Sequence, residues 1–239
     1  MPSIALNDLD DMRGAVFFDG PDVKRKLSRF WILLILASII ASAGVVSDST
    51  ATVIGAMIVA PLMTPILGTM LGVVLGDRAN LIRSIALVLS GATVAILIGY
   101  LLGLGLANPV TAATNAQVAG RVNPRLIDLI AALATGAVGS VALVRRDISE
   151  TLPGVAIAIS LVPPLTVVGL TAESRAWDES FGALFLFGTN VASILATGIV
   201  VMALYRVYQM VTPAATLMTR VPASSAGAIS ASVSRTMAG

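Results

Sequence analysis

The chain has 239 residues, of which 56% are hydrophobic and only 12% are charged, and its mean hydropathy is +0.93. Soluble domains usually carry about twice that share of charged residues, so the composition predicts an integral membrane protein whose partner is the lipid bilayer. Cys and His are both absent from the sequence, which excludes disulfides, thiolate metal sites and the commonest general base, and we expect no metal site and no cofactor. A net charge of +2 is too small to indicate a nucleic-acid partner, although the pI is 9.4.

Six apolar stretches reach the roughly 20 residues that a helix needs to cross a bilayer. Polar or charged residues separate each stretch from the next. We therefore expect an all-α integral membrane protein with six transmembrane helices. The predicted spans are Phe30–Val46, Ala51–Gly76, Leu81–Ala107, Leu126–Val144, Leu152–Thr171 and Phe181–Tyr205.

Lys and Arg are distributed unevenly around these spans. With the N-terminus in the cytoplasm, twelve of the 15 basic residues lie on the inner side, and Arg121, Arg125 and Arg175 lie on the outer side. Cytoplasmic loops carry the excess of basic residues, so the pattern predicts a multi-pass protein of the cytoplasmic (inner) membrane with both termini in the cytoplasm. The bias would weaken if Ala51–Gly76 were re-entrant, which favours a full crossing.

The two halves of the sequence resemble one another. Residues 86–95 align with residues 183–192, a register that pairs Thr93 with Asn190, and prolines interrupt the second span of each half. Each half contributes three crossings, an odd number, so the second half would enter the bilayer from the opposite side. The pattern predicts two inverted three-helix repeats, an architecture of many secondary transporters. Coincidence among small apolar residues is the alternative.

These spans divide the chain into five predicted segments. The cytoplasmic N-terminal tail is followed by the first repeat, an outer loop, the second repeat and a disordered cytoplasmic tail rich in Ala, Ser and Thr. Their boundaries are 1–29, 30–107, 108–125, 126–208 and 209–239.

Prolines break the second helix of each half near the middle of the bilayer. Pro61 and Pro65 do so in the first half, and Pro163 and Pro164 do so in the second. A proline inside a helix frees the carbonyl oxygen four residues earlier, and lipid cannot hydrogen-bond that oxygen. By this rule Met57 and Pro61 carry free carbonyls in the first half. Prolines that only kink the helices are the alternative.

We predict a substrate or ion site at the midplane between the two broken helices. Glycines near the breaks allow local unwinding, and nearby hydroxyl and amide groups add neutral oxygens. Asp48 or Ser49 caps the following helix, contacts the ligand, or does both. Charged residues are absent from the middle of the spans, so a neutral solute, a cation held by carbonyls and an anion at half-helix N-termini stay open. The predicted site residues are Asp48, Ser49, Gly55, Met57, Pro61, Thr64, Pro65, Gly154, Ser160, Pro163, Pro164 and Asn190.

Several of these motifs resemble a hydrophobic membrane family of bacteria and archaea, domain of unknown function 389. The likeness rests on Ser47–Ser49 and Ile54–Ile66 in the first half. In the second half it rests on Asn123–Pro124, Leu152–Leu165 and Thr189–Asn190. The resemblance covers residues 28–205 and implies a membrane fold, but it supplies no activity.

The residues favour a membrane transporter or channel-like permease for a small solute or ion. A non-transporting membrane scaffold or sensor is the alternative. An intramembrane enzyme would need a carboxylate pair such as Asp48 and Asp128, but Asp128 stands three residues after Arg125, where an ion pair is the simpler expectation, so we predict no enzyme. The glycine patterns in residues 68–76 and 99–103 allow close helix contact, either within one chain or in a homo-oligomer.

Overall fold

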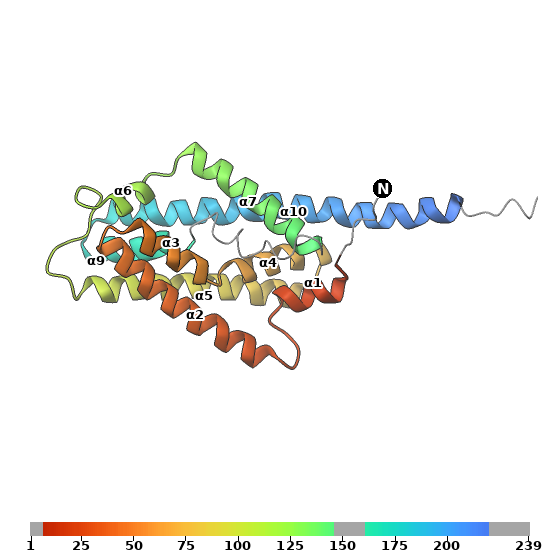
Figure 1. The fold of residues 1–239 in the computed structure, drawn as a ribbon, viewed down its shortest axis with the longest axis horizontal. Coiled ribbons are helices and arrows are strands. Elements are labelled where there is room, and N and C mark those ends of the chain that lie inside the picture. The colour runs from red at the N-terminus through yellow and green to blue at the C-terminus, as the bar shows by residue number, and fades with distance from the viewer. Residues whose placement is uncertain (1–6, 146–160, 220–239) are drawn as a thin grey trace, which may run out of the picture. The chain divides into compact units, whose positions relative to one another are not determined.

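The computed structural model describes residues 7–145 and 161–219. These ranges contain helices and no strand (Figure 1). The chain divides into two compact units, residues 1–202 and 203–239. All the packing described below belongs to the first unit.

Four helices of the described ranges are long and apolar enough to cross a membrane. They are α2 (Val23–Val46), α5 (Arg78–Gly103), α7 (Leu126–Val144) and the part of α10 (Trp177–Thr219) that ends at Tyr205. The described residues confirm an all-helical protein with several candidate membrane spans. Helix α10 continues past residue 209, where the predicted tail begins, and the predicted segment boundaries stay predictions.

The second span of each half is not one long helix. In the first half the chain bends by 46° between α3 (Thr50–Val59) and α4 (Met63–Leu75). Together these two helices would make a fifth crossing. In the second half α9 (Val162–Glu173) has only 12 residues. The predicted span Leu152–Thr171 begins before residue 161 and is described only from there, so six crossings stay a prediction.

Short helices precede the first long helix of each half. Helix α1 (Leu9–Val16) comes before α2 and packs on α4, and α6 (Ala116–Val122) comes before α7 and packs on α9. Helix α1 falls in the predicted N-terminal tail, and α6 falls in the predicted outer loop. Each half thus begins with a helix that covers the short helix of its own interrupted span.

The interior is built around α4 and α9. Residues 161–171 are all buried, and residues 62–72 are buried except for the half-buried Thr64. Helix α9 packs most extensively on α5, where Gly99 and Gly169 let the two backbones approach. The glycines at positions 68, 72 and 99 all pack within the chain.

The repeat register predicted from the sequence is wrong by two positions. It pairs Gly91, which packs against Leu34 and Leu62, with Gly188, which is exposed and has nothing within 4 Å of a Cβ. A separation of 99 residues instead places the buried positions of α5 on those of α10. Matching pairs are Leu87 and Leu186, Val88 and Phe187, Ala95 and Ile194, and Gly99 and Gly198. A shift of two residues turns a helix by about 200°, so the predicted register matched an inward face with an outward one.

The same separation recurs outside α5 and α10. Pro65 and Pro164 are both the third residue of a short helix, α4 and α9. Just after these helices, Gly76 and Arg175 both take the left-handed conformation, with φ of 71° and 59°. The two halves therefore agree in the position and the backbone geometry of these features. The similarity of residue types in the sequence did not show this agreement.

Candidate functional site

The first break lies between α3 and α4. Ser49 caps α3, because its side-chain oxygen accepts a hydrogen bond from the N–H of Thr52 at 3.4 Å, and its predicted capping role is confirmed. Helix α3 ends at Val59, Pro61 lies in the break, and α4 begins at Met63. Proline has no N–H and its ring collides with the preceding turn, so the helix stops there as predicted.

The carbonyl of Pro61 is not free, contrary to our expectation. The backbone N–H of Thr64 donates to it at 3.2 Å, because the chain re-forms a helical turn at once after the break. The hydroxyl of Thr69 donates to the carbonyl of Pro65 at 2.9 Å. The start of α4 therefore satisfies both oxygens with its own groups.

Gly55 and Met57 lie on α3, before the break. Met57 is half-buried and packs against the apolar cluster that contains Val45 and Val53. A Cβ at Gly55 would meet nothing within 4 Å, so no close approach requires a glycine there. In this structure Met57 is a packing residue of the interior.

The second pair of prolines begins a helix. Pro163 and Pro164 are buried in the first turn of α9, where proline is tolerated because the N–H groups of that turn have no partner within the helix. The hydroxyl of Thr166 donates to the carbonyl of Pro163 at 3.0 Å. The predicted site residues Gly154 and Ser160 lie outside the described residues.

Asn190 is a predicted site residue with an unusual environment. It lies near the middle of the candidate span Trp177–Tyr205 and is only 7% exposed. Its side-chain oxygen is buried and has no hydrogen-bond partner in the part of the chain that the structure describes. Thr93, its predicted equivalent, is exposed, and its hydroxyl donates to the carbonyl of Leu89 at 2.9 Å. The two residues therefore do not have equivalent environments. A buried polar atom without a partner costs about 1–3 kcal/mol and calls for an explanation.

Asp48 does not cap α3 and is not near the midplane. It is exposed at the turn between α2 and α3, with φ of 51°. Its carboxylate accepts a hydrogen bond from the N–H of Gln117 in α6 at 3.0 Å. The side-chain nitrogen of Gln117 in turn donates to the hydroxyl of Thr50 at 2.8 Å. These bonds attach α6 to the corner between α2 and α3.

Polar residues of α6 and its N-cap are structural features that the sequence reasoning missed. The side-chain nitrogen of Asn115 donates to the carbonyl of Val45 at 2.7 Å, and its oxygen accepts from the N–H of Val118 at 3.0 Å. Arg121 donates to the backbone carbonyl of Gln117 at 2.6 Å. Asn before an apolar residue three positions later is an N-cap signal, and it could have revealed the start of α6.

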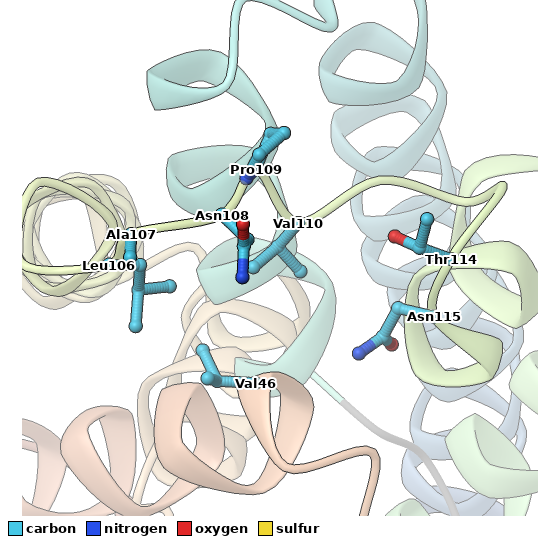
Figure 2. A pocket seen from close by; sticks show the side chains of 8 residues that line it. All are labelled: Val46, Leu106, Ala107, Asn108, Pro109, Val110, Thr114 and Asn115. Atoms are coloured by element: carbon cyan, nitrogen blue, oxygen red, sulfur yellow. The ribbon is translucent and has the colours of Figure 1, made fainter.

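A cavity of about 270 Å³ lies beside Asn115, the N-cap residue of α6 (Figure 2). It lies between the end of α2 and the loop that follows α5. None of its lining residues is a predicted site residue. They are Val46, Leu106, Ala107, Asn108, Pro109, Val110, Thr114 and Asn115.

A second polar cluster attaches α1 to the start of α5. Arg13 pairs with Asp77 at 3.0 Å, and the side chain and backbone N–H of Asn80 both donate to the same carboxylate, at 3.0 and 3.2 Å. The hydrogen bonds from Asn80, together with the nearby Arg13, hold the pKa of Asp77 below its ordinary value.

The contribution of Asp77 to stability should therefore depend on pH. Since its pKa is lower in the folded than in the unfolded chain, the ionised carboxylate stabilises the fold above the ordinary value of 3.8, and this stabilisation disappears as the pH falls through the folded-state pKa. We expect Asp77→Asn to lower the unfolding temperature in detergent at pH 7, and this difference from the unchanged protein to shrink as the pH falls below 3.8. A difference that is the same at pH 7 and in acid would contradict this assignment. Asp22→Asn removes an exposed ion pair with Arg25 and is the control, with a small effect throughout.

Comparison with known proteins agrees with the motifs that the two breaks contain. The family model described as Domain of unknown function (DUF389) matches residues 57–196, from the end of α3 to the middle of α10. The chain belongs to this family. The DUF389 match includes the described residues of both breaks and Asn190.

One relative is the uncharacterized protein MJ0678 of Methanocaldococcus jannaschii. It is 33% identical over 198 residues, which are 81% of this chain and 59% of the relative. The chain thus matches well under two thirds of that relative's length. No solved structure matches the chain.

Proposed function

We propose that this DUF389 protein is a membrane transporter or channel-like permease for a small solute or ion. The observation that carries the proposal is that both halves start a short buried helix at the same place, with Pro65 and Pro164 at its third position. In many secondary transporters the substrate binds near the midplane, where two such interrupted helices meet. The site would therefore lie between the starts of α4 and α9.

Two inverted repeats account for the agreement between the halves. The buried positions of α2 recur in α7 at a separation of 98 residues. Seven pairs match, and only Phe30 of α2 and Val144 of α7 are buried without a buried counterpart. The matching residues of α2 are Leu34, Ala37, Ser38, Ala41, Ser42, Gly44 and Val45, and those of α7 are Ala132, Thr135, Gly136, Gly139, Ser140, Ala142 and Leu143. With three crossings in each half, the second half would enter from the opposite side, and both termini would face the cytoplasm.

Contacts between the halves support the same proposal. In the second half Gly169 of α9 packs on Gly99 of α5, and in the first half Met70 of α4 packs on Gly198 of α10. The members of these two pairs correspond at the separation of 99 residues. Each short helix therefore packs on the last long helix of the opposite half, which is where alternating movement of one half against the other would act.

A non-transporting scaffold or sensor is the second candidate, and close packing favours it. Residues 161–171 are buried on every face, and the cavity in Figure 2 lies beside the loop after α5 instead of between the breaks. A scaffold needs no path through this interior. A transporter would have to open one.

Flux through proteoliposomes separates the two candidates. We expect the purified protein to carry at least one member of a panel of monovalent cations, small anions and neutral metabolites. Replacing the prolines (Pro61→Ala with Pro164→Ala) should reduce that flux by about tenfold or more, equivalent to ~1.4 kcal/mol, because Pro61 lies in the first break and Pro164 in the first turn of α9, and alanine would restore a backbone N–H at both places. Gly188→Ala, on an exposed face, is the control and should keep full flux.

Absence of flux for the whole panel, from protein that remains folded, would favour the scaffold. Unchanged flux in the proline variant would refute the role of the breaks. Thermal unfolding in detergent, measured on each variant, distinguishes lost function from lost structure.

A further inference from the structure

We propose that the side-chain oxygen of Asn190 is a ligand for a small monovalent cation. The inference names the ligand class of the midplane site and so deepens the proposed function. As a statement about binding it can be tested without any flux measurement.

The environment of Asn190 leaves its oxygen without a partner. The residue is 7% exposed in the middle of a candidate span, and its oxygen is buried and accepts from no donor among residues 7–145 and 161–219. An amide oxygen in this state needs either a hydrogen-bond donor or a cation.

Helix packing places Asn190 beside a small residue of α7. Gly136 packs on the backbone of Ile194, and the Ser140 hydroxyl bonds to α10 one turn further along at 3.1 Å, so the two helices run in parallel. One turn earlier, the same register brings Ala132, which is fully buried, beside Asn190.

In the first half, the position that corresponds to Asn190 is packed by apolar groups alone. Gly91 corresponds to Asn190, and Leu34 corresponds to Ala132. A methyl group of Leu34 lies 3.1 Å from where a Cβ at Gly91 would be. The fold can therefore fill this position without a polar atom. A buried amide lacking a partner is less stable than this apolar arrangement, which points to a role in ligand binding.

Asn190 also lies level with the break of its own half. In the first half Leu62, directly before α4, packs against Gly91. The corresponding residue before α9 is Leu161, and a side-chain hydrogen bond of 3.1 Å holds α9 to α10. The separation of 99 residues thus places Asn190 beside the start of α9.

The starts of α4 and α9 are poorly suited to an anion. An anion binds at a helix N-terminus through free N–H groups. Pro163 and Pro164 have no N–H, and neither does Pro65. At the start of α4 the N–H groups of Thr64 and Ile66 already donate to backbone carbonyls. Few donors remain at either start, whereas Asn190 offers an acceptor.

The charges favour a monovalent over a divalent ion. Among the described residues, no Asp or Glu lies in the middle of a candidate span, and Asp128, near the start of α7, pairs with Arg125 at 3.3 Å. Mg²⁺ and Ca²⁺ are usually held by carboxylates, whereas neutral carbonyl oxygens suffice for Na⁺ or K⁺. A single dehydrated charge on neutral oxygens is the ligand that this environment fits.

The test is thermal unfolding of the full chain in detergent, with LiCl, NaCl, KCl or NH₄Cl compared with choline chloride at equal ionic strength. We expect one of the small cations to raise the unfolding temperature in a saturable manner. Asn190→Leu should abolish this ion-specific rise. Ser193→Ala is the matched control, because Ser193 is also buried on α10 but donates to the carbonyl of Thr189 at 2.6 Å, and it should keep the rise.

Asn190→Asp keeps an oxygen and adds a charge, so it should lower the half-saturating cation concentration by about fivefold or more. It provides a readout if Asn190→Leu does not fold. The proposal is overturned if no small cation exceeds choline, or if both substitutions leave the half-saturating concentration unchanged. An ion-specific rise without flux would leave the binding site standing and refute transport. Flux of a solute without any ion-specific rise in unfolding temperature would support transport and overturn the cation site.

Discussion

Gly169→Ala should lower the free energy of unfolding by about 2–3 kcal/mol, the upper part of the range for overpacked cores. A Cβ at position 169 would collide with the backbone carbonyl of Ile96 and the N–H of Tyr100 on α5. Gly99 is equally constrained by the backbone of Thr166 on α9. Backbone atoms of a packed helix cannot turn aside as a flexible side chain can, so the helices would have to separate. Denaturant unfolding of the purified protein in micelles measures the loss.

Gly188→Ala is the matched substitution on α10. Nothing lies within 4 Å of a Cβ at this exposed position, so the change should be neutral or stabilising by up to ~1 kcal/mol, the helix-propensity gain of alanine. Similar losses for the two variants would show that the contact between α5 and α9 is not as close as described.

Local rules explain which parts of the fold could be predicted. Hydropathy located the long helices, since every backbone group in a bilayer must be bonded within its own helix. The end of α3 before Pro61 and the cap at Ser49 follow from the chemistry of single residues. The partner of the Pro61 carbonyl could not be predicted, because it depends on how soon the chain resumes a helix after the break.

The register of the two halves required knowledge of burial. The alignment by residue type paired Gly91 with Gly188, although Gly91 faces the interior and Gly188 is exposed. Small apolar residues occur on both faces of a membrane helix, so their similarity does not report orientation. Asn190 was selected through this register, and its buried, unpaired oxygen gives an independent reason for its importance.

Helix α6 was missed because its determinants are distant in sequence. It has only seven residues, AQVAGRV, which is too short for a helical hydrophobic period to be detected. The bonds that fix it, from Gln117 to Asp48 and Thr50, join residues that are 69 and 67 positions apart. The N-cap signal of Asn115 indicates where α6 begins, but no local pattern reveals these distant contacts.

Asn115→Ala should lower the free energy of unfolding by about 1–3 kcal/mol, the sum of a lost N-cap and a lost hydrogen bond to the Val45 carbonyl, which still accepts from the N–H of Asp48. Asn115 is 8% exposed and holds together two elements: it donates to Val45 at the end of α2 and accepts from Val118 at the start of α6. Thr114→Ala is the control, because Thr114 is exposed and its hydroxyl contacts only Thr111, and its effect should stay within about 0.5 kcal/mol.

Asn115→Asp separates the two roles of the side chain. An aspartate still accepts from the N–H of Val118, but it cannot donate to Val45 and would place a negative charge against that carbonyl. We therefore expect Asn115→Asp to be at least as destabilising as Asn115→Ala near neutral pH, and to recover as acid protonates the carboxyl group and restores a donor. Full stability of the aspartate variant at pH 7 would mean that the bond to Val45 contributes nothing and that only the cap of α6 matters. The pH dependence thus shows whether the bond to Val45 or the bond from Val118 holds the start of α6 against the end of α2.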